Sequence, residues 1–203
     1  MIPRRARFLL AFPLLATLLL GVPWAGPARA GALYQIDQRY GTVGFAVSVL
    51  GLFDVKGRFA RFDGELNLDL QRPELSSVRV ELDTPSVDMP QPDQAELLRS
   101  PAYFDVERFP RARFASQAIT PLSPTRYRIT GTVEIRGVTQ PLLLEANLLN
   151  RHTDTARGME VADLVITGEV LRSGFGMVAD RPALSDRVQL DIRIHLAVPA
   201  DAR

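Results

Sequence analysis

The sequence predicts an exported, single-domain, all-β protein. Three observations lead to this prediction: an apolar N-terminal segment that ends at a cleavage motif, strict alternation of apolar and polar residues along most of the remaining chain, and a complete lack of cysteine. Alternation places every second side chain on one face of a pleated strand. A series of such strands separated by turn residues is typical of a β-sandwich or β-barrel.

The first thirty residues have the parts of a signal peptide. Three arginines within the first seven residues precede an apolar run over residues 8–22. That run is shorter than the about 20 residues that a membrane-spanning helix needs. Ala28-Arg29-Ala30 forms a small-x-small motif. We therefore expect residues 1–30 to be removed after Ala30, leaving residues 31–203 as one domain in the periplasm or outside the cell. An uncleaved membrane anchor is the alternative, and the export route stays open.

Charge and composition exclude several classes of function. The chain has a formal net charge of +1, and removal of the four leader arginines changes the balance to 20 minus 23, or −3. A basic surface for nucleic acid is therefore not expected. Without cysteine there is no disulfide framework, thiolate metal site or lipid-modified cysteine. We expect no stable membrane insertion after cleavage, and residues 31–203 suffice for a packed core or a cavity.

The strands follow one another along the chain with short turns between them. The last is the clearest, because Val188 to Leu196 alternates apolar and polar residues throughout. Strands are expected over residues 42–49, 65–70, 78–82, 127–135, 142–148, 164–170 and 188–196. Only the stretch from Pro92 to Phe104 breaks the alternation, and it predicts one short helix across a barrel opening.

Residues suited to catalysis or metal binding are few. Beyond residue 30 the only histidines are His152, in an expected loop between Leu149 and Val161, and His195, on the polar face of the last strand. Both are expected to be solvated, and their spacing gives no zinc motif. The Ser173–Gly176 stretch is interpreted as a bulge or strand end rather than a nucleophile.

Carboxylate chemistry is the remaining catalytic alternative. Asp37 with Asp54, or Asp105 with Glu107, could serve as acid and base in a hydrolase, but nothing in the sequence brings either pair together across a cleft. We expect solvated surface carboxylates and no enzyme. A hydrolase is kept as the weakest hypothesis.

Particular short motifs, in a particular order, resemble the YceI-like, polyisoprenoid-binding family. They extend over most of residues 33–197, and their combination with an export signal is more specific than any single motif. The motifs are Tyr34-Gln35-Ile36-Asp37, Val43-Gly44-Phe45, Gly57-Arg58-Phe59, Phe62-Asp63-Gly64, Leu82-Asp83-Thr84, Ser86-Val87-Asp88, Leu98-Arg99-Ser100, Tyr103-Phe104-Asp105-Val106, Phe109-Pro110, Phe114, Gly131, Ile135-Arg136-Gly137-Val138-Thr139, Pro141, Arg172-Ser173 and Phe175-Gly176.

The resemblance implies an elongated eight-stranded antiparallel lipocalin-like barrel. In that family the interior tunnel holds a polyprenyl chain such as an isoprenoid quinone or polyprenyl phosphate, with no catalysis and no cofactor other than this ligand. Inward-facing apolar residues are the expected tunnel lining, although plain core packing is an equal alternative for each. The expected lining residues are Phe45, Val47, Phe59, Leu66, Val80, Phe114, Ile129, Val133 and Leu144.

Three arginines match recurrent positions of the family. Arg58, Arg99 and Arg172 could meet a ligand head group at the mouth, although a salt bridge or loop clamp is the stronger alternative. The chain also departs from the family, because Tyr40, Val49 and Leu97 stand where members often carry histidine. The expected interior is therefore more apolar than in those members, and the ligand could differ from theirs.

Two non-catalytic hypotheses follow. The first is a periplasmic carrier that sequesters an isoprenoid lipid in an apolar tunnel. The second is a solid barrel that docks an envelope membrane protein, such as a redox partner, through an apolar patch or a free edge strand. A homodimer is compatible with either hypothesis by family analogy.

Overall fold

The computed structural model describes residues 32–69 and 72–199. The signal peptide and cleavage site expected over residues 1–30 lie outside these residues. The described elements are β1 Ala32–Asp37, β2 Gly41–Val49, β3 Phe53–Phe59, β4 Phe62–Leu68, η1 Pro73–Leu75, β5 Ser77–Asp83, η2 Thr84–Ser86, β6 Val87–Asp88, α1 Pro92–Arg99, β7 Arg111–Ser123, β8 Arg126–Ile135, β9 Val138–Asp154, β10 Met159–Leu171, η3 Arg172–Phe175 and β11 Leu184–Pro199.

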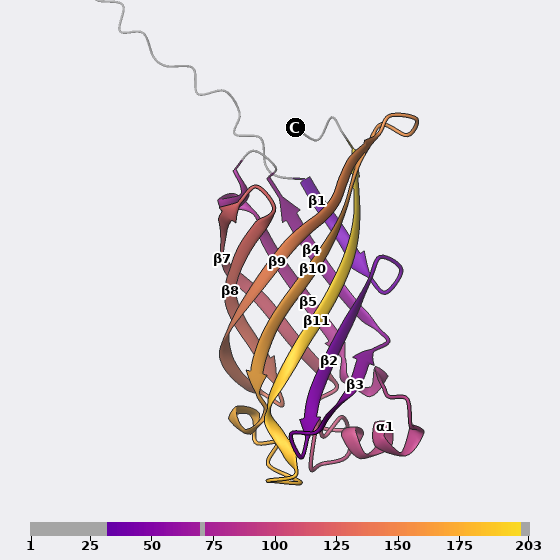
Figure 1. The fold of residues 1–203 in the computed structure, drawn as a ribbon, viewed down its shortest axis with the longest axis vertical. Coiled ribbons are helices and arrows are strands. Elements are labelled where there is room, and N and C mark those ends of the chain that lie inside the picture. Colours follow the sequence, from indigo (N-terminus) through magenta and orange to yellow (C-terminus); the bar gives the residue numbers. More distant parts are fainter. Residues whose placement is uncertain (1–31, 70–71, 200–203) are drawn as a thin grey trace, which may run out of the picture.

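One antiparallel sheet of eleven strands curls into an elongated barrel, which confirms the predicted fold class (Figure 1). The strand order is β1-β4-β5-β7-β8-β9-β10-β11-β2-β3-β6, so β1 and β6 are the two edges of the sheet. The expected strand number was eight. The structure thus has three more strands than expected; two of the eleven lie at the edges, where β6 has only two residues and β1 pairs only with β4 among the described strands.

The long strands on one side of the barrel form because their apolar residues keep a period of two over many residues. β11 pairs with β10 in unbroken register from Arg187 to Pro199. Its inward residues Val188, Leu190 and Ile192 pair with Val47, Phe45 and Val43 of β2. Alternation therefore fixes which face is buried, since a slip of one residue would reverse every side chain.

The prediction of a loop between Leu149 and Val161 is wrong. β9 continues to Asp154 and β10 begins at Met159, so this segment is a projecting hairpin at the upper end of the barrel in Figure 1. The pairing shifts register between Val161 and Asp163, and Asn150 has a φ of 50°. This β-bulge interrupts the apolar alternation, which is why the sequence pattern indicates a loop.

The short helix is confirmed as α1, and it lies beside the lower end of the barrel in Figure 1. Pro92 takes the first helical position, where its missing N–H is no loss. Ala95 is the buried residue of this helix. Among the described residues, no helix has both the length and the apolar character needed to cross a membrane.

The buried side chains line the inner wall of the barrel in two clusters. One contains Ile129, Leu144 and Phe175, and the other contains Phe59, Phe62 and Val87. Phe104 packs against both clusters. The inner wall therefore has an almost continuous apolar surface.

Candidate functional site

The candidate site is a cavity of about 330 Å³ inside the barrel. Its volume falls within the range of about 300–1,000 Å³ that is typical of small-molecule sites. Apolar side chains from the barrel strands make up most of its wall. All nine residues expected to face the interior do line it: Phe45, Val47, Phe59, Leu66, Val80, Phe114, Ile129, Val133 and Leu144. Their contact with a ligand stays a prediction.

An aromatic cluster forms one part of the cavity wall. The ring centroids of Phe45 and Phe59 are 5.7 Å apart, and those of Phe59 and Phe104 are 5.5 Å apart with a T-shaped arrangement. Gly57 leaves the room that this cluster needs, because a Cβ there would lie 2.5 Å from the Phe45 ring and 2.3 Å from Met89 Sδ. The two rings from β2 and β3 can therefore turn into the barrel rather than away from it.

The cavity is closed at the end where α1 lies. Its lining there includes Tyr103, Arg172 and Met177, which are only 4%, 3% and 6% exposed. Burial raises the pKa of Tyr103 to about 12, helped by the hydrogen bond that its hydroxyl donates to Asp180. The neutral phenol is thus the stable form in this enclosed position.

Arg172 is a loop clamp in this closed end. Its guanidinium donates hydrogen bonds to the carbonyl oxygens of Met177 and Ala179, at 3.0 and 2.7 Å. It also donates to those of Leu184 and Ser185, each at 2.9 Å. These bonds tie the segment after η3 to the start of β11. A head-group role for Arg172 stays a prediction, and these contacts favour the clamp.

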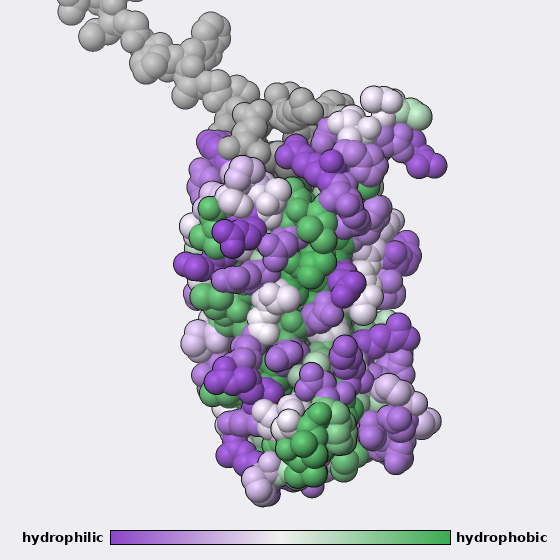
Figure 2. All heavy atoms as spheres, in the orientation of Figure 1, coloured by the Kyte–Doolittle hydropathy of each residue, from purple (hydrophilic) through white to green (hydrophobic). Residues whose placement is uncertain are grey.

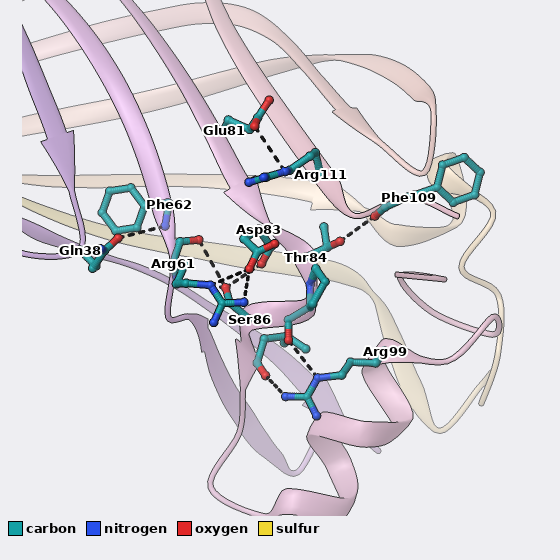
Figure 3. Close-up of polar contacts among 12 residues, drawn as sticks. Gln38, Arg61, Phe62, Glu81, Asp83, Thr84, Ser86, Arg99, Phe109 and Arg111 are labelled. Atoms are coloured by element: carbon teal, nitrogen blue, oxygen red, sulfur yellow. Dashed lines mark hydrogen bonds and ion pairs between the residues drawn. The ribbon is translucent and has the colours of Figure 1, made fainter. Parts of the chain in front are cut away.

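Arg99 and Arg58 have protein partners as well. Arg99 donates from Nε to the carbonyl of Pro85 at 3.0 Å and from Nη2 to that of Val87 at 2.8 Å, which ties α1 to β6 (Figure 3). Arg58 is exposed and pairs with Asp88 at 2.9 Å. The structure therefore does not bring the three arginines together, and head-group contact by Arg58 or Arg99 also stays a prediction.

The polar residues of the family-like motif after β5 also have structural partners. Thr84, 2% exposed, donates to the carbonyl of Phe109 at 2.6 Å (Figure 3). Ser86 donates to the carbonyl of Asp83 at 2.6 Å and accepts from the Arg61 backbone N–H at 3.0 Å. Thr84 and Ser86 thus satisfy backbone groups rather than lining the cavity.

Sequence reasoning missed the polar residues at the other end of the cavity. Arg151 and Glu160 both line it. The Glu160 side chain is 8% exposed, accepts from the Thr153 hydroxyl at 2.6 Å and pairs with Arg151 Nε at 3.4 Å. Arg151 is 52% exposed while also lining the cavity, so the interior meets solvent here. The sequence does place these charged residues near the ends of two apolar strands. The bulge at Asn150 breaks the alternation there, so the pattern did not indicate that they face the interior.

Among the described residues, the histidines and carboxylates considered above as catalytic candidates do not line the cavity. His152 is exposed, and His195 Nδ1 lies 2.8 Å from Asp163 Oδ1 on the outer surface. Asp37 pairs with Arg39 and Asp105 with Arg108, so each carboxylate has a cationic partner of its own. Within the described part of the chain, no group of three or more histidines and carboxylates could hold a metal ion.

Ser173 belongs to a turn rather than to a nucleophile site. It lies in η3, and its hydroxyl donates to Asp186 at 2.7 Å. This bond, followed by the pairing with Arg181, lowers the pKa of Asp186 to about 2. The expected bulge or strand end is thus a short 3-10 helix that follows β10.

Hydrophilic residues cover much of the visible face, and apolar residues show in a band along its middle and in a patch at its lower end (Figure 2). Figure 1 places the β2–β3 turn at that end. Three residues of this turn are strongly exposed: Leu50 at 64%, Leu52 at 79% and Phe53 at 57%. We call Leu50, Leu52 and Phe53 the apolar turn.

Comparison with known proteins gives one consistent family. The YceI-like domain matches residues 34–196. A UPF0312 protein of Azotobacter vinelandii is 32% identical over 183 residues, covering 89% of this chain and 95% of that protein. Protein YceI of Salmonella arizonae is 30% identical over 169 residues, covering 82% and 87%.

Solved structures agree on the fold. Burkholderia cenocepacia BcnA has a TM-score of 0.70 and 19% identity, covering 79% of this chain and 99% of that one. A polyisoprenoid binding domain from Saccharophagus degradans has a TM-score of 0.61 and 12% identity, covering 83% and 100%. The chain belongs to the YceI-like family.

Proposed function

We propose that this protein is a periplasmic carrier that holds an isoprenoid lipid, either a quinone or a polyprenyl phosphate, inside its barrel without chemical change. The observation that carries the proposal is the apolar cavity of about 330 Å³ along the barrel axis. The name of the Saccharophagus degradans neighbour, a polyisoprenoid binding domain of the same fold, supports it. Membership of the YceI-like family supports binding rather than catalysis.

The energetics suit an apolar chain. Burial of hydrocarbon contributes about 0.8 kcal/mol per methylene, so one five-carbon prenyl unit contributes up to about 4 kcal/mol before the cost of ordering it. Affinity can therefore be spread over many wall residues. This explains why the cavity needs no convergent polar motif along most of its length.

A charged substitution in the wall tests the proposal. Val133 is 9% exposed and lines the cavity, so Val133→Arg should abolish retention of a prenyl quinone added from detergent-free vesicles. Leu143→Arg is the matched control, because Leu143 is 49% exposed on the adjacent β9 and does not line the cavity. Normal retention by a folded Val133→Arg protein would exclude the cavity as the binding site.

Docking of an envelope partner is a second candidate function, favoured by the apolar turn. Single exposed apolar residues are common on protein surfaces, but here three strongly exposed apolar side chains lie within four residues of one turn. Leu52→Ser with Phe53→Ser should weaken partner capture or vesicle binding while leaving quinone retention unchanged. Unaltered association of this double variant with vesicles and with envelope proteins would remove the candidate.

A further inference from the structure

The open end of the cavity contains a polar cluster created by a β-bulge. Leu148 and Arg151 both line the cavity, although an unbroken strand would send residues three apart to opposite faces. The bulge at Asn150, with a φ of 50° and a register shift opposite, reverses the alternation. It thereby places Arg151 and Thr153 on the side of Glu160, and re-aiming side chains is a known use of such bulges.

The charges that line the cavity are already engaged. At the open end Arg151 pairs with Glu160 at 3.4 Å, and Asp69 pairs with Arg72 at 3.3 Å. At the closed end Arg172 donates to four backbone carbonyls. Arg113 borders the cavity, but its side chain points outward to Glu81 at 2.8 Å.

An anionic head group would therefore lack a free cation among the described lining residues. A phosphate at the open end would lie near the carboxylates of Glu160 and Asp69 and would have to compete with Glu160 for Arg151. Like charges in a partly buried site repel, and a phosphate that loses water without gaining a cation is disfavoured. An uncharged oxygen-bearing head group meets neither penalty, and it can exchange hydrogen bonds with the guanidinium or the threonine hydroxyl.

We propose that the Arg151–Thr153–Glu160 cluster is a specificity determinant that selects prenyl chains with an uncharged head group over prenyl phosphates. This inference rests on the proposed carrier function, and it assigns the head group to the β9–β10 end of the barrel. The three arginines expected from the family resemblance lie in or beside the closed end or on the outer surface, and they take no part in this selection.

The test compares two probes with the same chain, geranylgeraniol and geranylgeranyl monophosphate, by direct titration against the folded protein at low ionic strength. The wild-type protein should bind the alcohol more tightly. Glu160→Gln should shift the ratio of the two dissociation constants toward the phosphate by roughly fivefold or more, because it removes a repelling carboxylate and releases Arg151. Arg151→Gln should shift the ratio the other way.

Glu145→Gln is the matched control. Like Glu160→Gln, it removes one negative charge. Glu145 lies on β9 between the inward residues Leu144 and Ala146, and its side chain is exposed and faces outward. A wild-type preference for the phosphate would overturn the inference, as would equal shifts in Glu160→Gln and Glu145→Gln. If neither probe nor a prenyl quinone binds any of these proteins, the carrier function itself fails, which distinguishes the two conclusions.

Discussion

Filling part of the cavity with a larger side chain should lower the affinity for the ligand without lowering the stability of the protein. Val80 on β5 lines the cavity, opposite Gly64 on β4 and Phe114 on β7. Val80→Phe adds about four carbons that would occupy space otherwise available to a prenyl chain. Loss of four methylene-sized contacts corresponds to about 3 kcal/mol, or on the order of 100-fold in Kd.

A hollow barrel and a solid barrel respond differently to this substitution. In a hollow barrel the new ring enters empty space, so the free energy of unfolding should change by less than about 1 kcal/mol. In a filled core the same overpacking costs about 1–3 kcal/mol. Urea unfolding of the ligand-free protein, paired with isothermal titration of a prenyl quinone, measures both quantities.

The outward Leu143→Phe variant is the control for the added aromatic surface, because Leu143 is 49% exposed. It should match the wild-type protein in both measurements. A folded Val80→Phe protein that binds the quinone as tightly as wild type would refute the placement of the ligand in the cavity. A large loss of stability without any effect on binding would support a solid barrel.

Three further predictions concern the closed end. Arg172→Met should lower the free energy of unfolding by at least about 3 kcal/mol, measured in urea, since it strips the donors from four backbone carbonyls; a change below about 1 kcal/mol would contradict the clamp. The hydrogen bond from Ser173 is the main cause that lowers the pKa of Asp186 to about 2 in the folded state. The ionised Asp186 therefore stabilises the fold above about pH 4, and this stabilisation is lost as the pH falls from about 4 to about 2. Ser173→Ala should reduce this acid-dependent loss of stability, and an unchanged pH profile would refute the role of Ser173. Burial, followed by the hydrogen bond to Asp180, raises the pKa of Tyr103 to about 12, so the stabilisation from the neutral phenol is lost as the pH rises from about 10 to about 12. Absorbance titration at the tyrosinate band should show a late phase that Tyr103→Phe removes. If the late phase persists in Tyr103→Phe, it belongs to another tyrosine.

Strict alternation predicted the fold class because a period of two can bury only one face of a strand. The inward positions of β2, β5 and β8 follow directly from it, and Phe45, Val80 and Val133 line the wall as the alternation predicts. The alternation could not show that the wall surrounds a cavity. Filled and hollow barrels present the same inward pattern, and they differ in strand number, tilt and stagger and in the size of the inward side chains, which alternation does not report.

Bulges account for what the pattern concealed. β7 was not predicted as a strand, and its register shifts between Ser116 and Ala118 and again between Pro121 and Ser123. The Asn150 bulge made the upper part of β9 resemble a loop, and so hid the polar open end. The family-like arginines were the obvious head-group candidates, yet Arg99 and Arg172 bind backbone carbonyls. The family-like motif drew attention to these arginines, but only their contacts in the folded chain show that they stabilise backbone segments.

The most direct test of the carrier function is native mass spectrometry of the protein purified without detergent from its own host, followed by organic extraction and fragmentation of whatever is bound. The carrier proposal predicts one molecule of a prenyl lipid per barrel, and the inference about the Arg151–Thr153–Glu160 cluster predicts that its head group is uncharged. A protein that emerges empty, and that also fails to take up added prenyl quinones, prenols and prenyl phosphates, would contradict the carrier function.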